Sequence, residues 1–199
     1  MNLRTDLALI SEWILPEAHV LDLGCGDGTL LAHLRDTHQV TGYGLEIDDD
    51  NIARCIEAGV NVIHTDLNQG LSDFEDESFD YVVMTQAIQT IRRPDKLLME
   101  MLRVGHQVIV TFPNFGHWLA RFSLFFGGRM PMSPALPSEW YDTENIHLCT
   151  LKDFERLCDK LAITVLQRTV VDVTHNISWE MRILPNLFGE IALYRLRYK

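Results

Sequence analysis

A short apolar segment that leads directly into a glycine-rich turn places the strongest constraint on the fold. Residues 20–23 are apolar apart from Asp22, and the five residues that follow include Gly24, Gly26 and Gly28. Leucines then recur at positions 30, 31 and 34, which is helical spacing. This order predicts a strand, a tight turn and a helix, the unit from which parallel sheets are built.

The rest of the chain continues this alternation of strands and helices. Because parallel neighbours need crossover connections, helices should cover both faces of the sheet. The predicted fold is therefore a doubly wound, mostly parallel α/β sheet. Helices are expected over residues 3–14, over 50–58 with Asp50 as the N-cap, and around 97–102, and further strands over 40–47, 60–64, 79–85 and 108–111.

Residues 113–149 interrupt the alternation. Prolines at 113, 131, 134 and 137 break up a segment that is long for a simple connection. Trp118, Phe122, Phe125 and Phe126 still fit one helical face, and we expect them to pack in the core; an exposed patch would instead indicate a docking surface or a lid over the cofactor.

Regular structure is expected to resume at Thr150, which begins a capping-box sequence. Two last strands are predicted over 163–173 and 190–198. A chain of 199 residues is long enough for one well-buried core, and two halves would each bury little apolar surface. We therefore expect a single domain over 1–199 with a long inserted segment at about 113–149.

Composition and charge exclude several classes of protein. A hydrophobic share of 47% and a charged share of 23% are typical of a globular domain. The net charge of −11 would repel a phosphate backbone, so no nucleic acid partner is expected. The apolar stretch 118–126 is far shorter than the ~20 residues that span a bilayer, and the first residues lack the features of a secretory signal. The four cysteines form no CxxC pair, and we expect a cytoplasmic protein with no membrane partner.

The glycine turn points to a bound nucleoside. Glycines allow a sharp turn and let a ligand approach without meeting a Cβ atom. Glu46 ends the next strand, 20 residues beyond Gly26, where an acid can accept hydrogen bonds from both ribose hydroxyls. A lone GxG turn is common, and it is the acid at the neighbouring strand end that favours a cofactor site.

Charge distinguishes between the candidate nucleosides. A dinucleotide fingerprint needs a third glycine where this chain has Thr29, which disfavours a nicotinamide-dependent enzyme. Asp22 and Asp27 would also repel a pyrophosphate, but they suit the sulfonium and ammonium groups of S-adenosylmethionine. Asp66 closes the third strand and can accept from the adenine amino group, with the backbone of Leu67 beside it. We therefore expect S-adenosylmethionine or S-adenosylhomocysteine as the cofactor.

Two other features of this region have simpler explanations than catalysis. Cys25 has no histidine placed to activate it, so we interpret it as a small residue of the turn rather than a nucleophile. The acids at 48–50 begin a helix and suit capping and the helix dipole, so no metal site is predicted.

The motifs of the first half resemble those of class I S-adenosylmethionine-dependent methyltransferases. They are Val-Leu-Asp-Leu-Gly-Cys-Gly-Asp-Gly at 20–28, Gly-Leu-Glu at 44–46 and Phe-Asp-Tyr-Val-Val at 79–83. The second half carries Asn-Phe-Gly-His-Trp at 114–118, Gly-Arg-Met-Pro at 128–131 and a longer motif from Trp140 to Cys149. These resemble the methionine biosynthesis protein family MetW, and the resemblance then extends over nearly the whole chain.

The MetW resemblance implies a seven-stranded methyltransferase fold and a role in methionine biosynthesis alongside a homoserine O-acyltransferase, MetX. The leading hypothesis is a cofactor-binding protein that activates or regulates that acyltransferase, and the alternative is a stand-alone methyltransferase for a small-molecule acceptor. No catalytic residue is assigned. The expected cofactor site comprises Asp22, Gly24, Cys25, Gly26, Asp27, Gly28, Glu46, Ile47, Asp66 and Leu67, and the candidate substrate or partner residues are His117, Trp118, Tyr141, Asp142 and His147.

Overall fold

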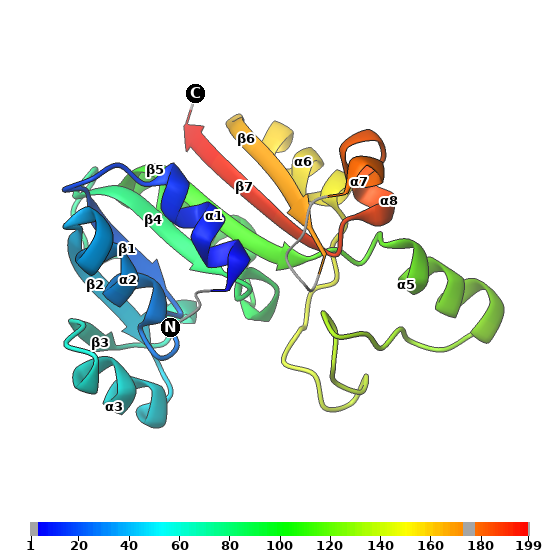
Figure 1. Ribbon diagram of the computed structural model, residues 1–199, viewed down its shortest axis with the longest axis horizontal. Helices are drawn as coiled ribbons and strands as arrows, with labels where there is room; N and C mark the ends of the chain where they lie inside the picture. Colours follow the sequence, from blue (N-terminus) through cyan, green and yellow to red (C-terminus); the bar gives the residue numbers. More distant parts are fainter. Residues whose placement is uncertain (1–3, 173–177, 199) are drawn as a thin grey trace.

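The computed structural model describes residues 4–172 and 178–198, which form a seven-stranded sheet with helices on both faces (Figure 1). The strand order is β3-β2-β1-β4-β5-β7-β6. β7 runs antiparallel to both of its neighbours, and the other pairs are parallel. The predicted doubly wound, mostly parallel sheet is confirmed. The strands are β1 (His19–Leu23), β2 (Thr41–Glu46), β3 (Val62–His64), β4 (Phe79–Thr85), β5 (Gly105–Pro113), β6 (Ile163–Val171) and β7 (Ile191–Tyr198).

Alternation along the strands divides the core into two layers, one on each face of the sheet. Val20 of β1 packs with residues of α1, α2 and α3, whereas Leu21 and Leu23 pack with α4 and α6 on the opposite face. Both layers are apolar, as expected of parallel strands that are buried on two sides. The helices are α1 (Thr5–Trp13), α2 (Thr29–His38), α3 (Asp49–Glu57), α4 (Pro94–Val104), α5 (Trp118–Phe122), α6 (Leu151–Lys160), α7 (Trp179–Ile183) and α8 (Pro185–Phe188), with 3-10 turns η1 (Leu67–Gln69) and η2 (Ile88–Thr90) and a π turn η3 (Ser123–Gly127).

Some predicted element boundaries were wrong by a few residues. The N-cap of α3 is Asp48 and not Asp50, because the Asp48 carboxylate accepts a hydrogen bond from the backbone N–H of Asn51 at 2.9 Å. β6 ends at Val171, and the last residue of the predicted strand, 173, lies outside the described residues. β3 is shorter than predicted, since the chain turns at residues 58 and 59 and the N–H of Val60 still donates to the carbonyl oxygen of Cys55 in α3.

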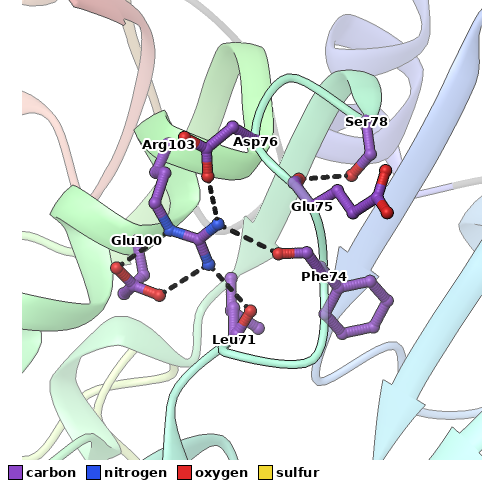
Figure 2. A network of polar contacts seen from close by, with 7 residues as sticks. All are labelled: Leu71, Phe74, Glu75, Asp76, Ser78, Glu100 and Arg103. Atoms are coloured by element: carbon purple, nitrogen blue, oxygen red, sulfur yellow. Dashed lines mark hydrogen bonds and ion pairs between the residues drawn. The ribbon is translucent and has the colours of Figure 1, made fainter.

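The connection from β3 to β4 contains a loop that the side chain of Arg103 holds in place (Figure 2). Its guanidinium donates to the carbonyl oxygens of Leu71 and Phe74, both at 2.9 Å, and pairs with the carboxylates of Asp76 and Glu100. Since Arg103 lies in the last turn of α4, the loop is tied to the helix that follows β4. Leu71, 1% exposed, reaches the core in place of a crossover helix.

The inserted segment is built very differently from the sheet. After β5 the chain forms α5 and the π turn η3, continues without regular structure past an isolated bridge between Ser133 and Leu136, and enters α6 through the predicted Thr150–Asp153 capping box. The expectation that its aromatic side chains belong to the core was wrong. The four predicted core residues are exposed, with exposed fractions from 44% for Trp118 to 82% for Phe125.

Candidate functional site

The glycine turn after β1 has the left-handed backbone that its sequence predicts. Gly24, Gly26 and Gly28 have φ angles of +69°, +55° and +76°, a region that L side chains rarely adopt. A Cβ atom on Gly28 would lie 3.0 Å from Cys55 Sγ, so this glycine lets α2 approach α3. A Cβ atom on Gly26 would meet no atom within 4 Å. The turn is therefore closely packed on one side and open at Gly26.

Glu46 supports the open side of the turn from the carboxyl end of β2. Its Oε2 accepts from the backbone N–H of Gly26 at 2.8 Å. Its Oε1 accepts from the N–H groups of Ile47 and Asp48 at 2.8 and 3.0 Å. A carboxylate has about four acceptor positions, and three backbone N–H groups already use those of Glu46, so roughly one remains for a ligand. A second ligand donor would have to share an acceptor position with one of these N–H groups.

Asp22 is the most unusual group at this edge of the sheet. Its side chain is buried, with 1% of the residue exposed, and Oδ1 has no hydrogen-bond partner among the described residues. Burial, and then the negative charge of Glu46, raise the pKa of Asp22 to about 7. Since a buried carboxylate without compensation is costly, the site favours either a proton or a ligand cation at this position.

Cys25 and Cys55 pack the underside of the turn. Their sulfur atoms lie 3.7 Å apart, and Cys55 Sγ donates to the carbonyl of Gly26 at 3.1 Å. Burial raises the pKa of both thiols, which keeps them neutral and poorly nucleophilic. Gly44 of β2 passes beneath Cys25, where a Cβ atom would lie 2.3 Å from the sulfur. These contacts favour the interpretation of Cys25 as a residue that shapes the turn.

The other two predicted acids make local hydrogen bonds. Asp27 accepts from the hydroxyl and the N–H of Thr29 at the start of α2, and the hydroxyl bond lowers the pKa of Asp27. Asp66 accepts from the backbone and side-chain amides of Asn68, which likewise lower the pKa of Asp66. Both carboxylates are therefore negative at neutral pH. The Leu67 side chain approaches the turn, 3.9 Å from the position of a Cβ atom on Gly24.

The loop after β4 also contributes to this site, although no motif in the sequence predicted it. The Cβ atom of Ala87 lies 3.4 Å from the position of a Cβ atom on Gly24, so this loop packs against the glycine turn. Gln89 is 6% exposed, and its Oε1 has no partner among the described residues. The glutamines at 86 and 89 gave only a weak indication in the sequence, because glutamines at a strand end are not a recognised nucleoside-binding motif.

The first turn of α1 also reaches this edge of the sheet. Asp6 is fully buried, pairs with Arg4 at 2.9 Å and accepts from Gln86 Nε2 at 3.3 Å. The charge of Arg4 also contributes to lowering the pKa of Asp27. Asp6 is therefore linked to Gln86 at the end of β4, and Arg4 acts on Asp27 of the glycine turn, which no spacing in the sequence indicated.

The five candidate substrate or partner residues do not form one cluster. His117 is buried beside Glu190, with 3.8 Å between Nε2 and Oε1, and burial lowers the pKa of His117. It lines a small cavity at the end of β5 together with Asn114 and Glu190. His147 is exposed and approaches the backbone oxygen of Arg92 at 3.3 Å. Trp118, Tyr141 and Asp142 are exposed on the inserted segment, and a shared catalytic role is not supported.

Within residues 4–172 and 178–198, no group of three or more His, Cys, Asp or Glu side chains is arranged to hold a metal ion. In the same part of the chain, no helix has the length and apolar character needed to cross a membrane.

Comparison with known proteins identifies the family. A model of the family "Methionine biosynthesis protein MetW" matches residues 4–196. The chain belongs to the MetW family. A curated relative, the bifunctional methionine biosynthesis protein MetXA/MetW of Rhodopirellula baltica, is 35% identical over 202 residues, which is 97% of this chain and 32% of the relative. This MetW-family chain thus spans about a third of the length of that protein.

Solved structures share the fold of this MetW-family chain at low sequence identity. A SAM-dependent methyltransferase from Archaeoglobus fulgidus superimposes with a TM-score of 0.71 at 16% identity, covering 97% of this chain and 91% of its own. The [4+2]-cyclase SpnF gives a TM-score of 0.67 at 15% identity, covering 98% and 80%. The same fold therefore accompanies more than one named activity, and the function has to be argued from the site.

Proposed function

We propose that this chain binds S-adenosylmethionine, or S-adenosylhomocysteine, in the cradle formed by the turn 22–28 and Glu46. The observation that carries the proposal is the buried oxygen of Asp22, which has no hydrogen-bond partner among the described residues, in the same turn as Gly26, where an added Cβ atom would meet no other atom. The ammonium group of the ligand would supply the missing partner of Asp22, while a pyrophosphate would add negative charge to an acidic site.

The ribose and adenine are assigned to the neighbouring strand ends. Glu46 would accept from a ribose hydroxyl through its remaining acceptor position, and binding of both hydroxyls would require Gly26 or Asp48 to share a site. Ile47 is 57% exposed beside Glu46 and offers an apolar surface for the adenine ring. Asp66 and Leu67 would contact the adenine edge. Once bound, the cofactor would supply an activated methyl group or serve as a signal of methionine supply.

We further propose that the chain acts with a MetX-type homoserine O-acyltransferase and activates or regulates it. The Rhodopirellula baltica relative, whose name joins MetXA to MetW, supports this. Fusion of two activities on one chain keeps them at high effective concentration, as expected of components that work together. Because the cofactor is made from methionine, its binding would allow feedback on methionine synthesis.

One experiment tests both parts of this proposal. Calorimetric titration should show binding of S-adenosylmethionine by the wild type, no binding of NAD, and no binding of either by an Asp22→Ala/Glu46→Ala variant. Acyltransferase activity of MetX is then measured alone, with the wild type, and with the variant. An unchanged rate and no complex with the wild type would refute the partnership, and acceleration by the variant would show that cofactor sensing is unnecessary.

A stand-alone methyltransferase is the second candidate. The observation in its favour is the small cavity at the end of β5, where His117 and Glu190 could orient an acceptor. Methyl transfer needs alignment and exclusion of water more than a dedicated base. Transfer of a labelled methyl group from the cofactor into a metabolite extract would establish this activity, and absence of labelled product with a cofactor-bound protein would refute it.

A further inference from the structure

The inserted segment presents a concentration of apolar side chains that the proposed cofactor site does not use. We call residues 118–148 the apolar arm. Among the described residues, 12 of the 23 large hydrophobic side chains that are exposed lie in these 31 positions. They are Trp118, Leu119, Phe122, Leu124, Phe125, Phe126, Met130, Met132, Trp140, Tyr141, Ile146 and Leu148. Such a concentration marks an interaction surface.

Both ends of the apolar arm are tied to the body of the protein. At its start, the Arg121 guanidinium donates to the backbone oxygen of Gly116 at 2.6 Å and reaches that of Asn186 at 3.4 Å. At its end, the N–H groups of Ile146 and His147 both donate to the backbone oxygen of Gln89 in η2, at 3.1 and 3.0 Å. The arm is thus presented from a fixed base.

The composition of the arm is that of an interface core rather than of a solvated loop. It contains two arginines and three acids, although the whole chain carries a net charge of −11. Its exposed aromatic and methionine side chains belong to the types that are enriched where proteins meet. Phe125 and Phe126 pack edge to face, with ring centroids 4.7 Å apart, so they form one projecting ridge.

The position of α5 and η3, which carry the aromatic ridge, argues against a lid over the cofactor, although the other end of the arm is bonded to the loop that packs against the glycine turn. Figure 1 shows α5 projecting beyond α8 at one end of the sheet, whereas α2 and α3, which flank the glycine turn, lie at the other end. A second copy of the chain is also disfavoured, because each copy would bring a net charge of −11 to the other.

We propose that the apolar arm is the surface on which the MetX-type acyltransferase docks. This inference rests on the proposed partnership and adds where the contact is made. The family match extends from residue 4 to 196, so the arm lies inside the region shared with the fused MetXA/MetW relative. Aromatic side chains such as Phe125 and Trp140, 82% and 72% exposed, would fill apolar pockets of the partner and carry much of the binding free energy.

The experiment measures the affinity of the full chain for a separately expressed MetX-type homoserine O-acyltransferase by surface plasmon resonance. The Phe125→Asp/Phe126→Asp variant should bind at least 100-fold more weakly than the wild type. The matched control is Leu15→Asp/Ile56→Asp, because these two side chains are 65% and 66% exposed outside the arm, and its affinity should stay within threefold. Calorimetric binding of the cofactor by both variants shows that they are folded.

The outcomes distinguish failure of the docking surface from failure of the proposed partnership with the acyltransferase. Unchanged affinity of the Phe125→Asp/Phe126→Asp variant would overturn the docking surface and leave the partnership standing. No binding by the wild type would overturn both. If sedimentation shows a wild-type dimer that the arm variant dissociates while MetX binding persists, the occupant is a second copy and the inference fails.

Discussion

The glycine turn and the apolar arm use non-regular backbone in opposite ways. In the turn, the backbone N–H groups of Gly24, Cys25, Gly26 and Gly28 are held by hydrogen bonds, whereas one buried oxygen of Asp22 has no partner among the described residues and Gly26 faces open space. In the arm, the backbone is anchored at its ends while large side chains face solvent. This difference indicates which kind of ligand each region binds. A buried carboxylate without a partner favours a small cation, and an exposed apolar ridge favours a large apolar partner.

The largest effect on cofactor binding is expected from Glu46→Ala, which removes the acceptor of three backbone N–H groups. We expect loss of cofactor affinity by more than 100-fold and a decrease in the free energy of unfolding of about 2–4 kcal/mol, because the turn loses its support. Calorimetry and thermal denaturation measure the two effects. Glu57→Ala, at an exposed position of α3, is the control and should change neither. Affinity within threefold of the wild type would contradict the assignment of the turn.

Two glycines of the turn separate stability from ligand binding. Gly28→Ala places a Cβ atom 3.0 Å from Cys55 Sγ and 3.2 Å from a Val60 methyl group, and with its left-handed backbone it should destabilise the fold by about 2–3 kcal/mol. Gly26→Ala has the same backbone problem but meets no neighbour, so only about 1 kcal/mol is expected. Its methyl group would enter the proposed ligand space and weaken binding by 10-fold or more. The idea fails if Gly26→Ala binds the cofactor normally.

Asp22→Asn should show that the Asp22 carboxylate lowers the free energy of unfolding while it favours cofactor binding. The pKa of Asp22 is raised to about 7 in the folded protein from 3.8, so the folded state binds the proton more tightly than the unfolded state. The contribution of Asp22 to stability is therefore present below about pH 4 and is lost as the pH rises to about 7. Asn remains neutral, so the variant should become more stable than the wild type over this window, by roughly 2–3 kcal/mol at pH 8.

Cofactor affinity should change in the opposite direction at the same residue. For the wild type, affinity for the cationic ligand should rise as the pH increases through about 7, because the carboxylate becomes available. Asp22→Asn should bind at least 10-fold more weakly and show little pH dependence over that range. Urea denaturation and calorimetry at pH 5, 6, 7 and 8 measure both trends. Parallel pH profiles for the two proteins would contradict the role of Asp22.

The two regions also differ in how far the sequence predicted them. The turn was predicted closely because its constraints are local: left-handed glycines, an apolar strand before them and an acid at the next strand end. What escaped prediction depends on tertiary packing. The contact of Ala87 with the turn and the approach of Asp6 to Gln86 join segments that are far apart in the chain. The capping error at Asp50 arose because three consecutive acids all suit an N-cap, and the backbone selects Asp48.

The arm was predicted less well, because helical periodicity identifies an apolar face and does not say what covers it. Trp118 and Phe122 have the spacing of a core-facing stripe, yet they are 44% and 56% exposed. The prolines at 131, 134 and 137 gave a hint, since they lie between the stripe and the next helix and disfavour a regular element that could cover it.

The smallest effect on the free energy of unfolding is expected at Phe125 in the apolar arm, in contrast to the substitutions in the glycine turn. Phe125 is 82% exposed, so Phe125→Ser removes little buried surface and should change the free energy of unfolding of the isolated chain by less than about 0.5 kcal/mol. Phe154, 3% exposed between Phe112 and Tyr194, provides the reference, and Phe154→Ala should destabilise by about 3–5 kcal/mol. Urea denaturation of both variants makes the measurement. A destabilisation by Phe125→Ser that approached the Phe154→Ala value would mean that the arm folds back onto the protein in solution, and the surface would then be unavailable to a partner.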